Sequence, residues 1–234
     1  MPPHDSGPLA EATPLSSVIE RENLDDKIYA QLRSLIENQR LLPGHRIPVD
    51  RLAREMGVSR TPVVNALKRL AQELVVEWVS HRGIYLRSLT KWELTRFLEI
   101  REALEGLAAR LAASCISLEE VDQLTAMFKG LDLTPHGPSV QRYTEKDRHF
   151  HMRLLQIAGN RPLLHVVNSV HLMIFTYQLG LFRPPEETIQ EHLAILAALR
   201  RRDPEASEAA MRLHIRRSLE RLRQEAEAEE PRGQ

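Results

Sequence analysis

The sequence predicts a mainly α protein with two domains, the first combining helices with a β-hairpin and the second an antiparallel all-α helical bundle. Two observations carry this prediction. Residues 24–90 change from a helical to a strand-like period, whereas residues 91–226 keep helical periodicity without a repeat or a strand candidate. We therefore expect a flexible N-terminal arm at 1–22, domains at 23–90 and 91–226, and a C-terminal tail at 227–234.

Composition places the chain among ordinary globular proteins, with 42% hydrophobic and 27% charged residues. The single cysteine, Cys115, excludes an internal disulfide framework. No apolar run approaches the roughly 20 residues that a bilayer requires, and the N-terminus lacks the pattern of a signal peptide. We therefore expect a cytoplasmic protein with no membrane partner.

The first domain begins with a helix whose apolar residues fall on one face, and the segment "LLPGHRIP" ends that helix. A second short helix, "VDRLAREMG", ends at Gly57, and a third begins at Ser59, a residue favoured as an N-cap. The third helix shows the i, i+3, i+4, i+7 spacing of a buried face: Val63, Ala66, Leu67 and Leu70. Two strands follow, "VVEWV" and "IYLRSL", with "SHRG" as the turn between them.

Two helices joined by the short turn "MGVSR" can present the third helix to the major groove of DNA. Its outward side carries groups suited to base edges and phosphates: Arg60, Thr61, Asn65 and Lys68. The hairpin tip adds groups suited to the minor groove or the backbone: His81, Arg82 and Gly83. Residues 24–90 hold eleven Lys and Arg against seven Asp and Glu, a net of +4, which permits a polyanionic partner. The alternative is a small helical domain whose basic residues are simply solvated.

In the second domain the stretch "DRHFH" (147–151) divides between two faces of one helix. Phe150, Leu154 and Ile157 define its apolar stripe, and Asp147 and His151 lie on or beside that stripe, one turn apart. A carboxylate that faces a core is costly unless it is paired or binds a cation. A self-contained Asp147–His151 hydrogen bond is one way to satisfy it.

Two further histidines, His192 and His214, fall within the apolar stripes of two later helices. A single histidine on an apolar face is usually a satisfied core residue, but three with a carboxylate in one bundle shift the balance toward a metal site. Imidazole and carboxylate suit a divalent transition metal, with zinc first and nickel or manganese as alternatives.

Arg101 falls within the predicted buried stripe of an earlier helix: Leu94, Phe97, Leu104, Ala108 and Leu111. Because a guanidinium stays charged, it needs an anion there. That anion is either a nearby acid, such as Glu105 or Asp147, or the carboxylate of an effector bound beside the metal.

The segment "LLPGHRIPVDRLAREMGVSRTPVVNALKRL", followed by "HRGIYL", resembles the winged helix-turn-helix domain of the GntR family of bacterial repressors. The motif "VSRTPV" is the most specific part of this resemblance. Two positions depart from the family pattern. Val64 stands where the family usually has a DNA-contacting Arg, which leaves the operator sequence open. Leu74 stands where the family favours Gly, so we expect the end of that helix to differ.

The pattern Asp-x3-His, then "GN", then "EHLAILAALRRRDPEASEAAMRLHI" resembles the FCD effector domain of the FadR-like branch of the same family. Together the two resemblances cover about residues 24–222. The second implies four metal ligands, Asp147, His151, His192 and His214, and supports Arg101 as a clamp for the effector. The family resemblance also implies a homodimeric transcriptional regulator that binds double-stranded operator DNA and a small organic acid. Because members of the family typically repress transcription, we expect a repressor. A metal-dependent hydrolase or lyase on the helical bundle is the alternative, and a metal-stabilised interaction module without an effector is a third.

Overall fold

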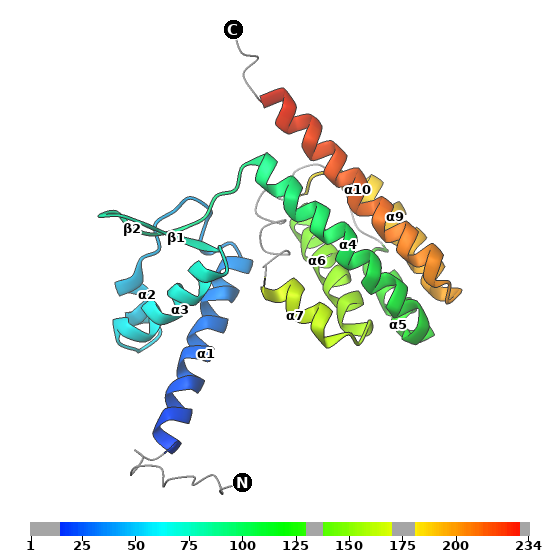
Figure 1. Ribbon diagram of the computed structural model, residues 1–234. Coiled ribbons are helices and arrows are strands. Elements are labelled where there is room, and N and C mark those ends of the chain that lie inside the picture. The colour runs from blue at the N-terminus through cyan, green and yellow to red at the C-terminus, as the bar shows by residue number, and fades with distance from the viewer. Residues whose placement is uncertain (1–14, 130–137, 170–180, 230–234) are drawn as a thin grey trace, which may run out of the picture. The chain divides into compact units, whose positions relative to one another are not determined.

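The computed structural model describes residues 15–129, 138–169 and 181–229. The chain divides into two compact units, Met1–Arg87 and Ser88–Gln234. The predicted fold class is confirmed, since helices and one small two-stranded sheet make up the first unit and helices the described part of the second (Figure 1). None of the described helices has the length and hydropathy needed to span a membrane.

The N-terminal unit has a helix-turn-helix followed by a hairpin. Its elements are α1 (Leu15–Glu37), α2 (Val49–Glu55), α3 (Arg60–Gln72), β1 (Val76–Val79) and β2 (Gly83–Leu86). The strands pair antiparallel, with Val76 opposite Leu86 and Val79 opposite Gly83. The segment before α2 lies along β2, because the Ile47 N–H donates to the Ile84 carbonyl (2.8 Å) and Arg46 forms a bridge with Tyr85.

The turn between α2 and α3 depends on Gly57, whose φ of +67° lies in the left-handed region. The N–H of the next residue, Val58, donates a hydrogen bond to the Ala53 carbonyl at 3.0 Å and caps the end of α2. Ser59 occupies the N-cap position of α3 as predicted, although its side chain makes no capping hydrogen bond. The four predicted apolar residues of α3 are all buried, which fixes the face that the helix presents to solvent.

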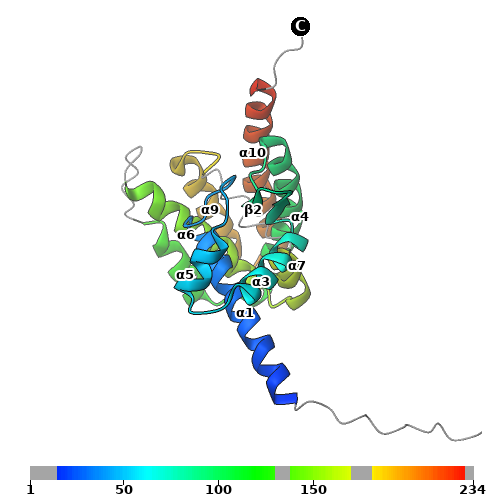
Figure 2. The same ribbon diagram turned by 90° about the vertical axis from the view of Figure 1, so that its left-hand side faces the viewer.

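The C-terminal unit is a bundle of helices. In chain order they are α4 (Lys91–Cys115), α5 (Leu118–Met127), α6 (Pro138–Ile157), α7 (Arg161–Ser169), α9 (Pro185–Arg200) and α10 (Pro204–Glu229). Helices α4 and α10 lie side by side and run antiparallel (Figures 1 and 2). Lys91 at the start of α4 pairs with Glu225 near the end of α10 at 3.1 Å, and Arg110 pairs with Glu205 at 2.9 Å. Helix α4 therefore stays in register with α10 along its length.

The buried face of α4 is wider than the sequence predicted. Leu94 and Ala108 are buried as expected, but Phe97, Leu104 and Leu111 are only partly buried. Other residues on the helix are fully covered: Leu98, Ala109, Ala112 and Ala113. The reason is that α4 is covered by α6 as well as by α10, so a single stripe does not describe it.

Some boundaries differ from the sequence-based expectation. Helix α1 begins at Leu15, inside the segment expected to be an arm, and α10 continues to Glu229, inside the expected tail. The two units divide after Arg87 rather than after residue 90. Most of the expected break at 133–139 lies outside the described residues.

The expectation for Leu74 is wrong. Leu74 adopts the left-handed conformation, with φ of +62°. Its N–H donates to the Ala71 carbonyl (3.1 Å), and the Val75 N–H donates to the Leu70 carbonyl (2.9 Å), which is the hydrogen-bond pattern of a Schellman cap. Because Val75 is fully buried, the chain must reverse at Leu74 whichever residue stands there.

We predict that Leu74→Gly stabilises the N-terminal unit by about 1 kcal/mol. A left-handed residue with a Cβ costs about 1–2 kcal/mol, and glycine removes this cost. Part of the gain is lost because glycine increases the conformational entropy of the unfolded chain. Leu74 is 57% exposed, so little packing is lost. Urea unfolding followed by Trp78 fluorescence, in a Trp92→Phe background, measures the change. Leu74→Ala is the control and should give no comparable gain; equal gains in both variants would contradict the strain argument.

Candidate metal centre and nucleic-acid interface

Four candidate metal ligands meet inside the C-terminal unit. Asp147 and His151 come from α6, His192 from α9 and His214 from α10. All four side chains are buried, and one potential donor atom from each lies within 4.8 Å of those from the others. The structure therefore brings together the four residues that the sequence singled out from three separate helices.

The Nε2 atoms of the three imidazoles face the same point. His151 Nε2 lies 3.2 Å from His214 Nε2, and His192 Nε2 lies 3.2 Å from Asp147 Oδ1. Asp147 Oδ2 is 3.9 Å from His151 Nε2. His192 Nε2 is buried and makes no hydrogen bond. A buried nitrogen without a hydrogen bond is costly, and a bound cation would satisfy it.

Each imidazole is held through its other nitrogen. His151 Nδ1–H donates to the Glu105 carboxylate, and His214 Nδ1–H donates to Glu191 at 2.8 Å. His192 Nδ1 forms a hydrogen bond with the Tyr143 hydroxyl at 3.2 Å, and that hydroxyl bonds Thr188 Oγ1 at 2.6 Å. A proton fixed on Nδ1 leaves the lone pair of Nε2 free for a metal, which is how histidine ligands are usually oriented in proteins.

Aromatic rings enclose His192, which is fully buried. Phe128 stacks on the imidazole with ring centroids 4.7 Å apart, and Phe150 lies at 4.6 Å. These rings shield one side of the site from water, so the approach to the site must come from elsewhere.

The protonation states suit cation binding. Burial lowers the pKa of both His192 and His214, so the neutral imidazole needed by a metal is favoured. Burial acts to raise the pKa of Glu191, but hydrogen bonds from His214, Arg183 and Arg217 outweigh it and bring the pKa to about 2. The pKa of Glu105 is likewise lowered, because Arg101 and His151 together outweigh its burial. Both outer carboxylates are therefore ionised.

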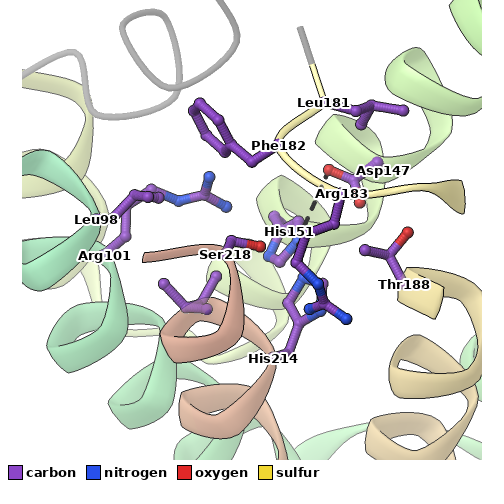
Figure 3. A pocket seen from close by; sticks show the side chains of 11 residues that line it. Leu98, Arg101, Asp147, His151, Leu181, Phe182, Arg183, Thr188, His214 and Ser218 are labelled. Atoms are coloured by element: carbon purple, nitrogen blue, oxygen red, sulfur yellow. Dashed lines mark hydrogen bonds and ion pairs between the residues drawn. The ribbon is translucent and has the colours of Figure 1, made fainter. Parts of the chain in front are cut away.

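A pocket of about 390 Å³, open solvent included, reaches three of the candidate ligands: Asp147, His151 and His214 (Figure 3). Arg101 extends from α4 to its wall, and Thr188 and Ser218 add hydroxyl groups. Leu98, Phe182 and Ile215 supply apolar surface to the same pocket. The pocket therefore has a polar and an apolar side.

Arg101 is buried, as its place on the helix predicted, with 3% of its surface exposed. Its Nε–H donates to Glu105, one of the two acids that the sequence offered as a partner. It also lines the pocket, so it lies between Glu105 and the open space of the pocket.

Sequence reasoning did not assign Glu191, Tyr143 or Arg183 to the site, and it named Glu105 only as a partner for Arg101. Arg183 donates from both terminal nitrogens to Glu191, at 2.7 and 2.8 Å, and also pairs with Glu187 at 3.1 Å. Only the packing of different helices brings these groups to the histidines. The one local signal was the position of Glu191 immediately before His192.

The expected DNA-reading residues lie on the surface of the N-terminal unit. Exposed residues on α3 are Arg60, Thr61, Asn65 and Lys68, and exposed residues at the hairpin tip are His81 and Arg82. Arg60 pairs with Asp50 at 3.2 Å, both side chains being 67% exposed. Gly83 has φ of +111°, and a Cβ there would come within 2.8 Å of Arg46 Nε. Arg46, an exposed cation that the sequence did not single out, thus lies directly beside the predicted tip.

The fold defines a class of protein: a transcriptional regulator with a winged helix-turn-helix unit and a helical unit that encloses a buried Asp and His cluster. Comparison with known families agrees. Residues 24–86 match "Bacterial regulatory proteins, gntR family", and residues 96–217 match the "FCD domain". The chain belongs to the GntR family of transcriptional regulators, in the branch that carries an FCD domain.

Individual relatives are regulators of transcription. The "HTH-type transcriptional repressor RspR" of Escherichia coli (strain K12) is 29% identical over 208 residues, which cover 86% of this chain and 90% of RspR. The "Probable D-xylose utilization operon transcriptional repressor" of Paenarthrobacter nicotinovorans is 28% identical over 182 residues, or 77% and 80% of the two chains. The solved structure of E. coli McbR/YncC shares the fold, with a TM-score of 0.70 at 22% identity, covering 86% and 98%.

We predict that Glu191→Gln lowers the affinity for zinc by about 10–100-fold, because the amide holds the His214 ring less firmly than the carboxylate does. Glu187→Gln is the matched control. Glu187 also pairs with Arg183, but its side chain is 58% exposed, and we expect its substitution to leave zinc affinity within about twofold. Competition with a chromogenic chelator measures both, and equal losses in the two variants would contradict the assigned role of Glu191.

Proposed function

We propose that this regulator holds a divalent metal at Asp147, His151, His192 and His214, and that a small organic acid bound beside the metal changes its affinity for operator DNA. The observation that carries the proposal is the convergence of three buried Nε2 atoms on one carboxylate, each imidazole being fixed through Nδ1. FCD domains often bind metal, and the buried Asp and His cluster here could hold one.

The donor set fits the metal. Neutral imidazole nitrogens and one carboxylate oxygen suit zinc, with nickel and manganese as the alternatives. When bound, the metal supplies positive charge and open coordination positions to which an anion can attach. Arg101 would add a guanidinium that orients the carboxylate of that anion, since it lines the same pocket.

We favour regulation over catalysis because of how the nearby carboxylates are used. Glu105 is engaged by Arg101 and His151, and Glu191 by His214 and two arginines. Neither is therefore placed as a general base for a metal-bound water. The regulators among the relatives point the same way.

The N-terminal unit would read the operator with α3 in the major groove and the hairpin tip at the minor groove or backbone. Arg60 and Asn65 are the candidates for base contacts, while Thr61, Lys68, His81, Arg82 and Gly83 are candidates for positioning. A homodimer would carry two such readers, and effector binding would bias their arrangement, a coupling between separate sites. The protein would act in the cytoplasm, where its operator lies.

For the metal we predict that His151→Ala loses bound zinc while His149→Ala keeps it. The two histidines stand two residues apart on α6, but His151 is buried among the candidate ligands and His149 is exposed. Metal content after dialysis against a weak chelator measures the difference. Full retention of zinc by His151→Ala would contradict the proposed site.

For the DNA we predict different effects from two exposed residues of α3. Asn65→Ala should lower affinity for a duplex from upstream of the protein's own gene by about 1–3 kcal/mol and leave the salt dependence unchanged, because it removes a base contact. Lys68→Ala should weaken the real and scrambled duplexes alike and reduce the salt slope by about one. Fluorescence anisotropy across a salt series distinguishes these patterns. If neither variant changed affinity for the real duplex, the proposed reading surface would be wrong.

A further inference from the structure

Both arginines that line the pocket are already ion-paired with glutamates of the same unit. Arg101 pairs with Glu105, and the two side chains are 4% and 2% exposed. Arg183 pairs with Glu191, and these side chains are 7% and 9% exposed. The two guanidinium groups therefore do not act as surplus positive charge, although each reaches the pocket wall (Figure 3).

The buried charges at the pocket can be counted for the described residues. Three carboxylates, of Asp147, Glu105 and Glu191, stand against the two guanidinium groups, so the buried set carries a net charge of −1 with neutral imidazoles. A divalent metal changes this to +1. The half-exposed Arg217 and the more exposed Glu187 offset each other and are screened by solvent.

A single negative charge brought by a ligand thus neutralises the metal-loaded pocket. A second would be buried without a cation to compensate it, which is strongly unfavourable.

We infer that the metal-loaded pocket selects organic monoanions, in particular monocarboxylic acids with an uncharged remainder, and discriminates against dicarboxylic acids. This inference rests on the proposed metal site and adds the charge class of its effector. The remainder of the acid would meet the apolar side chains of Leu98, Phe182 and Ile215 and the hydroxyl of Ser218. Without metal the pocket is negative overall and should bind neither class.

The test is calorimetric titration of the zinc-loaded full chain with acids matched in carbon number. The probes are butanoate against succinate, and 2-hydroxybutanoate against malate. Of the two monocarboxylates, we expect the one that binds more tightly to bind at least about tenfold more tightly than the dicarboxylate of the same pair. We expect the zinc-free chain to bind neither monocarboxylates nor dicarboxylates. An indicator dye in parallel samples confirms that no acid removes the zinc.

A gain-of-function variant strengthens the test. Ser218→Arg places a further cation at the pocket wall and should bring the affinity for malate to or above that for 2-hydroxybutanoate. Ser218→Gln, a neutral substitution, should keep the original preference; melting temperatures confirm that both variants fold.

The inference is overturned if succinate binds the wild-type zinc protein as tightly as butanoate, or malate as tightly as 2-hydroxybutanoate. It is also overturned if neither monocarboxylate binds the zinc protein. Equal binding by the zinc-free chain would also overturn it. Failure of the metal site itself is recognised separately, because wild-type protein and His151→Ala would then retain the same amount of zinc.

Discussion

The C-terminal unit depends on three hydrogen bonds that each fix an imidazole from a different helix. Glu105 on α4 holds His151 on α6, Tyr143 on α6 holds His192 on α9, and Glu191 on α9 holds His214 on α10. Together they connect α4, α6, α9 and α10 in sequence. Because every bond uses Nδ1, every Nε2 is left facing Asp147 or a neighbouring imidazole, and the bundle keeps in its core a cluster of donor atoms that could hold a cation.

The surroundings of this cluster limit how it can be reached. Phe128 and Phe150 shield His192, so access is through the pocket beside Arg101 and Ser218. The outer carboxylates that orient the histidines also neutralise the arginines of the pocket. Glu105 and Glu191 thereby set both the orientation of the histidine rings and the net charge of the pocket.

Much of this arrangement could be predicted from helical periodicity. Asp147 and His151 are one turn apart, and His192 and His214 each fall within an apolar stripe, so counting by 100° per residue places all four inside. The apolar spacing of α3 and the two strand-like segments around the turn "SHRG" likewise predicted the helix and the hairpin of the N-terminal unit. The outer partners could not be found in this way, since Glu105 and Tyr143 are 46 and 49 residues from the histidines they hold.

Two local predictions failed for physical reasons that lie outside the local sequence. The buried face of α4 was placed too narrowly because α6, α7, α9 and α10 all pack against it. Leu74 adopts the left-handed conformation because burial of Val75 requires the chain to reverse there. In both cases tertiary packing outweighed a local preference that was correctly identified.

The proposed metal centre can be examined by X-ray absorption spectroscopy of the zinc-loaded full chain. We expect a zinc edge whose first shell contains only nitrogen and oxygen, at about 2.0–2.2 Å, with outer-shell scattering from three imidazole rings. A sulfur ligand, which could come only from Cys115 or a methionine, or scattering from fewer than two imidazoles, would contradict a centre built from Asp147, His151, His192 and His214.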